Sequence, residues 1–250
     1  MDDSIKPVYL FADSQLLFWE DERGLFMRRV REHLSAAAPK AAYLGASNRD
    51  RPEFYDIFVA AMNNIGVTNC RLIPSRPSLE DVRFLEQADL ILLAGGDVKR
   101  GWDVFVDNGF DELLPQRYYD GALLMGVSAG ALQLGKRAWS GHEPTEYNLF
   151  PTLKLVPLVL SVHERSDWPN LRKLVELSGG ITEGVGIPAG GGLIYHPEHT
   201  LEPVRYPAYS IWLNEGEITE SLLVPWKEEG VQSAPTVLSP TEIIDPRNQH

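Results

Sequence analysis

Residues 122–130 of this 250-residue chain read ALLMGVSAG and form its most informative segment. The first four residues are apolar, as is typical of a strand covered on both faces of a sheet. The last five match the pattern G-x-S-x-G, which holds a serine on a sharp turn between a strand and a helix. Gly126, Ala129 and Gly130 supply the small neighbours that such a crowded turn needs. The segment therefore predicts that Ser128 is a hydrolase nucleophile; the alternative is an idle serine in a glycine-rich turn.

The sequence before this segment alternates between apolar runs and helical patterns. Further strands are expected at 8–12, 40–45, 70–73 and 90–94. Helices are expected at 24–35, 52–65, from Ser78 onward, at 102–119 with a break near 108–109, and at 129–134. Apolar strands that alternate with helices predict an α/β fold of three layers, in which a mostly parallel central sheet carries the nucleophile elbow. More antiparallel strands are expected afterwards, at 156–162, 192–195, 210–213 and 220–224.

Two of these helices carry local start and stop signals. Asp50 is expected to cap the helix that begins near Pro52, because a carboxylate accepts hydrogen bonds from the first free N–H groups. Gly66 stands at the end of that helix, where a left-handed residue is favoured. Ser78 and Asp81 have the spacing of a capping box.

Composition limits the functions that are open to the chain. Its formal charge is −12, which argues against nucleic acid as a partner because phosphate binding needs a clustered positive surface. Cys70 is the one cysteine, so neither an internal disulfide nor a cysteine/histidine metal cluster is expected. We see no secretory signal and no apolar run of membrane-spanning length, and we expect a cytoplasmic protein. One domain is expected over residues 1–250, with a loosely ordered tail from about 227 to 250; a homodimer is left open.

A second glycine-rich turn follows the strand expected at 90–94. Gly95 and Gly96 let the backbone approach a ligand closely, so the N–H of Gly96 can form an oxyanion hole together with that of Ala129. The alternative is an ordinary turn at the end of a strand.

A serine nucleophile needs a base, and six histidines are available. His163 directly follows the apolar run 156–162, and the end of a strand is a rigid place from which to present an imidazole. His142 lies in a loop and is the next candidate. A solvated loop histidine is the alternative for His163.

These segments resemble, in order, those of the peptidase S51 family, which contains aspartyl dipeptidase (peptidase E) and cyanophycinase. Residues 126–131 resemble the family's elbow, 93–97 its Gly-Gly loop, and 155–163 the segment that ends in its catalytic histidine. The resemblance extends over about 8–204 and includes 43–55 and 184–187. It implies a fold related to class I glutamine amidotransferases, with serine in place of cysteine. It also implies His163 as the base and hydrolysis of a peptide bond next to aspartate, without metal or organic cofactor.

The third catalytic member is expected to be Glu143. Cyanophycinase has a late acid that resembles such a member, but here Pro188 follows the corresponding strand. An aspartate fifteen residues after the serine resembles the partner in aspartyl dipeptidase, and Glu143 stands at that spacing. Glu146 is the nearest substitute, whereas Glu164 is expected to point away from the histidine on an extended segment. The alternative is that Glu143 is a solvated loop carboxylate.

The leading functional interpretation is a serine peptidase that cleaves a peptide or isopeptide bond in a short, Asp-containing peptide through an acyl-enzyme on Ser128. Arg165 and Arg172 are expected to bind an acidic group, because a guanidinium offers two parallel donors to a carboxylate. Asp97 is a further expected substrate contact. An esterase or amidase acting on a specialised metabolite, and a non-catalytic binding module of the same fold, are the alternatives.

Overall fold

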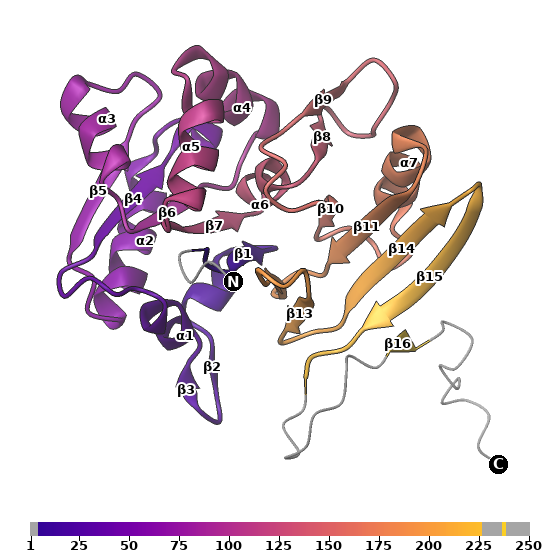
Figure 1. Ribbon diagram of the computed structural model, residues 1–250, viewed down its shortest axis with the longest axis horizontal. Coiled ribbons are helices and arrows are strands. Elements are labelled where there is room, and N and C mark those ends of the chain that lie inside the picture. The colour runs from indigo at the N-terminus through magenta and orange to yellow at the C-terminus, as the bar shows by residue number, and fades with distance from the viewer. Residues whose placement is uncertain (1–4, 227–236, 239–250) are drawn as a thin grey trace.

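The computed structural model describes residues 5–226 and 237–238, and it contains two larger sheets (Figure 1). The first has seven strands in the order β13-β12-β1-β7-β6-β4-β5. Its five parallel strands are β1 (Val8–Phe11), β4 (Lys40–Leu44), β5 (Asn69–Ile73), β6 (Leu90–Leu93) and β7 (Leu123–Val127). The antiparallel strands β12 (Gly192–Tyr195) and β13 (Leu201–Val204) extend it at one edge. The expected mostly parallel sheet is confirmed, and the elbow strand β7 lies at its centre.

Helices cover both faces of this sheet. One face carries α1 (Met27–Glu32) and α2 (Pro52–Asn64), and the other carries α3 (Leu79–Glu86), α4 (Val98–Asp107), α5 (Phe110–Tyr119) and α6 (Ala129–Leu134). Successive side chains of a strand point to opposite faces. In β4, Tyr43 accordingly packs in the hydrophobic cluster of Phe58, whereas Leu44 packs in the cluster of Phe105 and Leu114. This alternation produces the three layers.

The second sheet consists of strands from the later part of the chain. Its order is β10 (Val159–Val162), β11 (Thr182–Ile187), β14 (Ala208–Asn214), β15 (Glu217–Leu223) and β16 (Val237–Leu238). The antiparallel strands expected at 210–213 and 220–224 are confirmed as β14 and β15. The strand expected at 156–162 differs: it begins at Val159 and pairs in parallel with β11. Helix α7 (Pro169–Ser178) packs on this sheet through Leu171 and Val175. These side chains belong to the same buried cluster as Leu44, so one hydrophobic core joins the two sheets.

Short elements fill the connections. They are η1 (Ser14–Leu17), the hairpin of β2 (Glu20–Asp21) and β3 (Gly24–Leu25), η2 (Ala46–Asn48), and the hairpin of β8 (Arg137–Trp139) and β9 (Leu149–Pro151). No described helix is both long and apolar enough to cross a membrane. The tail expected at 227–250 lies outside the described residues, apart from 237–238.

Two helix boundaries and one helix cap differ clearly from those expected. The helix expected at 24–35 is confined to α1, because its first residues form the β2–β3 hairpin. The helix expected at 102–119 begins earlier, at Val98, because Asp97 caps it; the expected break is present and gives α4 and α5. Asp50 does not cap α2: its carboxylate accepts a hydrogen bond from the backbone of Ser75 instead.

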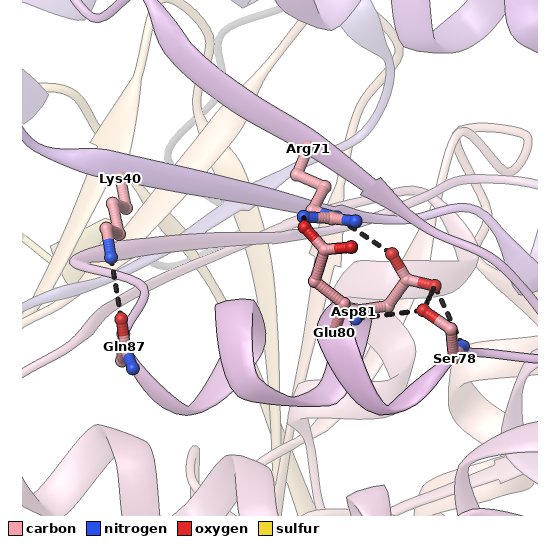
Figure 2. Close-up of polar contacts among 6 residues, drawn as sticks. All are labelled: Lys40, Arg71, Ser78, Glu80, Asp81 and Gln87. Carbon is pink, nitrogen blue, oxygen red and sulfur yellow. Dashed lines mark hydrogen bonds and ion pairs between the residues drawn. The ribbon is translucent and has the colours of Figure 1, made fainter.

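The capping box expected at the start of α3 is confirmed and is tied to the neighbouring strand (Figure 2). The Ser78 hydroxyl accepts a hydrogen bond from the Asp81 backbone, and the Asp81 carboxylate accepts one from the Ser78 backbone. Arg71 on β5 donates to the Asp81 carboxylate at 2.8 Å and to Glu80 at 3.0 Å. Burial acts to raise the pKa of Asp81, but the hydrogen bonds from Ser78 and Arg71 outweigh it and lower that pKa.

Glu202 ties the antiparallel edge of the first sheet to α1. Only 9% of its surface is exposed, and its two oxygens accept hydrogen bonds from the Arg29 guanidinium, both at 2.8 Å, and from His196 at 2.9 Å. Burial acts to raise the pKa of Glu202, but the hydrogen bonds from His196 and Arg29 prevail and lower it to about 2. A lowered carboxyl pKa means that the ionised form stabilises the folded state.

We expect Glu202→Gln to lower the free energy of unfolding by about 3 kcal/mol at pH 7, because Arg29 then lacks its buried partner. The carboxylate contributes its full stabilisation above the unfolded pKa of about 4.3 and loses it as the pH falls toward 2. Urea denaturation measures the free energy of unfolding of both proteins. The difference between wild type and variant should be smaller near pH 2.5 than at pH 7. Glu86→Gln, at an exposed position of α3, serves as the control. An equal difference in unfolding free energy at both pH values would contradict a stabilising role for the ionised Glu202 carboxylate.

Candidate active site

Ser128 occupies the turn between β7 and α6 in a conformation that few side chains adopt. Its φ is 50° and its ψ is −110°, a strained geometry for a residue other than glycine. The chain packs closely around it: a Cβ atom on Gly130 would collide with the Leu93 carbonyl, and one on Gly126 would lie 2.5 Å from the Gly130 backbone. The small residues of the elbow are thus required by direct backbone contact. The strand, turn and helix predicted around Ser128 are confirmed.

Four parallel strands end at the same edge of the sheet, and their following loops form the site. Ala12 follows β1, Ser47 follows β4, Gly95 follows β6 and Ser128 follows β7. These residues line one cavity. The Ser128 backbone N–H donates to the Phe11 carbonyl at 2.8 Å, which fixes the elbow against β1. Open α/β sheets bind ligands at this carboxyl edge.

His163 reaches the serine from the second sheet. It follows the last residue of β10, and its backbone N–H donates to the Ile187 carbonyl of β11 at 2.9 Å. Its φ of 45° turns the chain out of the sheet. The Oγ of Ser128 lies 3.0 Å from Nε2 of His163, a hydrogen-bonding distance. The structure therefore brings together the two side chains that the sequence singled out.

The Gly-Gly loop after β6 lies against the elbow. A Cβ atom on Gly95 would lie 3.3 Å from the Cβ of Ser128. Gly96 has a φ of 133° and approaches Ser47 so closely that any Cβ would collide with the Ser47 carbonyl, which also accepts a hydrogen bond from the Asp97 backbone at 2.8 Å. Only glycine fits this conformation and this space. The loop therefore has a fixed place beside Ser128.

Gln133 is a buried residue that sequence reasoning missed. It lies on α6, has no exposed surface, and donates through Nε2 to the Ser47 hydroxyl at 3.2 Å and to the Val98 carbonyl at 3.0 Å. It thereby joins α6, the helix that follows Ser128, to Ser47 and Val98, which flank the Gly-Gly loop. A buried polar residue in the apolar run of α6 was the available sequence signal.

The structure does not join Glu143 to His163. The Glu143 carboxylate is largely exposed and lies 3.8 Å from the ammonium of Lys173 on α7. Within residues 5–226, no carboxylate hydrogen-bonds to the second ring nitrogen of His163. Glu164 is turned away from the histidine, as expected, and accepts hydrogen bonds from the backbone of Asn170 and Leu171 at the start of α7.

The two arginines expected to bind substrate occupy different surroundings. Arg172 forms an ion pair with Glu220 and donates to the Tyr209 hydroxyl at 2.7 Å, so its guanidinium is already paired within the second sheet. Arg165 is exposed, lies 3.6 Å from Asp167, and lines a cavity beside Ser128. Asp97 lines another cavity at the serine, but its Oδ1 accepts the Arg100 backbone N–H as the cap of α4.

Two cavities open at the serine. The larger, of about 600 Å³, extends between the ends of β1, β4 and β6 and the first turns of α2. The smaller, of about 430 Å³, lies between α6, the β8–β9 hairpin and α7. Gly96, Ser128 and His163 line both of them. In the described part of the chain, no three His, Cys, Asp or Glu side chains gather where they could hold a metal ion.

Arg49, Arg51 and Arg100 line the larger cavity and were not among the expected substrate residues. They lie in the loop after β4 and in the first turn of α4. The sequence did contain a signal for these arginines, because a polar loop after a parallel strand lies at the same sheet edge as the carboxyl ends of the other strands. Reading it required the strand order, which places β4 next to β6.

The sequence matches the family described as Peptidase family S51 over residues 8–201. A peptidase from an acI-B1 Actinobacterium has a similar structure, with a TM-score of 0.64 and 14% identity over 89% of this chain and 96% of that one. A peptidase E-like protein from Listeria monocytogenes EGD-e gives a TM-score of 0.52 and 17% identity over 88% of this chain and 99% of that one. No curated protein matches the sequence significantly.

The fold and the serine–histidine contact are those of an α/β serine hydrolase. The chain belongs to peptidase family S51, as the match over residues 8–201 shows. It is therefore a hydrolase of the serine-peptidase type, and its fold is consistent with the class I glutamine amidotransferase-like architecture.

We expect Gln133→Leu to lower kcat about tenfold while KM changes less than about threefold, because Ser47 and Val98 lose the donor that holds the Gly-Gly loop. Steady-state kinetics on one peptide substrate measures kcat and KM separately, and thermal unfolding shows whether the variant is folded. Gln116→Leu, at an exposed position of α5, controls for the change in polarity. A lower melting temperature with unchanged kcat would reduce Gln133 to a packing residue.

Proposed function

We propose that the chain is a serine peptidase that cleaves a peptide or isopeptide bond in a short peptide through an acyl-enzyme on Ser128. The single observation that carries this proposal is the 3.0 Å contact between Ser128 Oγ and His163 Nε2 at a strained strand-to-helix turn. Strain is retained at a turn where the exposed side chain has a chemical role. Membership of peptidase family S51 supports the same reaction.

The geometry supports a two-step reaction. Ser128 Oγ attacks the carbonyl carbon of the scissile bond, and its proton passes to Nε2 of His163. The N–H groups of Gly96 and Ala129 stabilise the negative oxygen that forms. The intermediate collapses to an acyl-enzyme, and the leaving amine takes the proton from His163. Water then attacks the ester with His163 as its base and returns Ser128 to the free hydroxyl.

We propose that Ser128 and His163 act as a pair without a carboxylate partner. The Ile187 carbonyl fixes the backbone of His163. Glu164, the next residue, accepts hydrogen bonds through its carboxylate from the start of α7. Among the described residues, the imidazole is held by its contact with Ser128 Oγ and not by an acidic side chain.

Ser128→Ala should abolish hydrolysis and leave the fold intact, because it removes one oxygen and keeps a small side chain. We expect a loss of several orders of magnitude in kcat. A fluorophosphonate should label the wild-type protein on Ser128 and leave the variant unlabelled, and a dipeptide library read by mass spectrometry should separate a peptidase from an esterase. Wild-type turnover by the variant would refute the proposal, and an unlabelled wild type would favour a binding module.

Glu143→Gln should change kcat less than about threefold, because its carboxylate faces Lys173 and solvent. His163→Ala is the matched positive variant and should lose most of the activity. The measurement is kcat and KM for both variants on one peptide substrate. A large fall in kcat for Glu143→Gln at unchanged KM would restore Glu143 as the third catalytic member.

A further inference from the structure

Two cavities meet at Ser128, because Gly96, Ser128 and His163 line both of them. A peptide whose scissile bond is at Ser128 would therefore have one cavity on each side of that bond. The larger cavity has the size of small-molecule pockets in general, which span about 300–1,000 Å³. It has room for a large residue.

The floor of the larger cavity is apolar. Phe58 and Leu92 are almost fully buried beneath it, and Tyr43 packs on Phe58 with ring centroids 5.3 Å apart. Phe54 and Ile57, on the same helix α2, complete this lining, and 43% of the surface of Phe54 is exposed. Apolar area of this kind binds an aliphatic or aromatic side chain by removing both surfaces from water.

The rim of the same cavity is cationic. Arg49, Arg51 and Arg100 are exposed, and none of the three forms an ion pair with a carboxylate of the described residues. The two acidic residues of the lining are already engaged: Asp13 accepts backbone hydrogen bonds from Gln15 and Gly190, and Asp97 caps α4. Unpaired guanidinium groups in a chain of formal charge −12 provide the donors that a ligand carboxylate needs.

The smaller cavity offers a different environment. Its lining includes Glu164, whose carboxylate already accepts hydrogen bonds from the start of α7, and Arg165, which lies beside Asp167. A group that is both apolar and negatively charged is therefore better matched by the larger cavity.

We propose that the larger cavity binds the C-terminal residue of a short peptide, with a bulky apolar side chain on the floor and its free carboxylate on the arginine rim. This inference rests on the proposed function, because it makes that residue the leaving group. The bond between its nitrogen and the acyl carbon breaks, the serine oxygen takes the acyl group, and the amine leaves with the proton from His163. The product is a free amino acid such as phenylalanine or leucine.

Binding to Ser128→Ala tests this inference without turnover. Isothermal titration calorimetry would compare Asp-Phe with Asp-Phe amide, Asp-Gly and Ala-Phe. We expect Asp-Phe and Ala-Phe to bind at least about tenfold more tightly than the amide and Asp-Gly, as an ionic hydrogen bond and a buried ring each allow. In the same background, Arg49→Ala or Arg51→Ala should remove most of the difference between acid and amide. Phe54→Ala should reduce the preference for phenylalanine over glycine.

Arg83→Ala, an exposed arginine on α3, is the charge-matched control and should leave all four affinities unchanged. Equal affinity of the acid and the amide would overturn the inference. So would strong binding of Asp-Phe amide with loss of Ala-Phe, which would show that the arginines bind the aspartate side chain, and so would absence of binding by every peptide. Fluorophosphonate labelling of the wild type separates the two proposals: labelling without acid–amide discrimination rejects only this inference, whereas discrimination without labelling rejects the peptidase, and with it the leaving group, and keeps only the binding site.

Discussion

Gly130 on α6 lies so near the Leu93 carbonyl at the end of β6 that no Cβ atom fits between them, and this close packing is the constraint on which the rest depends. It allows α6 to begin directly above the sheet, so that Ser128 must turn through a positive φ and present its hydroxyl at the sheet edge. The same closeness brings the Gly-Gly loop against the elbow. A side chain at Gly130 would push α6 away from β6, and one at Gly95 would push the Gly-Gly loop away from Ser128.

The second sheet has a distinct part in this arrangement. Its parallel pair β10–β11 ends at the level of Ser128, and the Ile187 carbonyl holds the backbone of His163 where the chain leaves the sheet. Ser128 and His163 therefore follow strands of different sheets, which share one apolar core. Their 3.0 Å contact depends on how the two sheets pack, and not on any local motif.

The sequence predicted the parts of the structure that have a local cause. The apolar runs predicted the parallel strands, the small residues around Ser128 predicted the elbow, and a strand end predicted the place of His163. It could not show the contacts between side chains of distant segments. Arg172 on α7 pairs with Glu220 on β15, and Glu143 faces Lys173. The arginines of the larger cavity were missed because their grouping depends on strand order.

The collision that any side chain at Gly96 would make with Ser47 has a consequence for the evolution of this protein. A position that accepts only glycine cannot vary, so changes of substrate must arise elsewhere. Arg49 in the loop after β4, and Arg51 and Phe54 at the start of α2, are exposed and border the larger cavity. Diversification among relatives should therefore concentrate there, while the elbow and the Gly-Gly loop stay invariant.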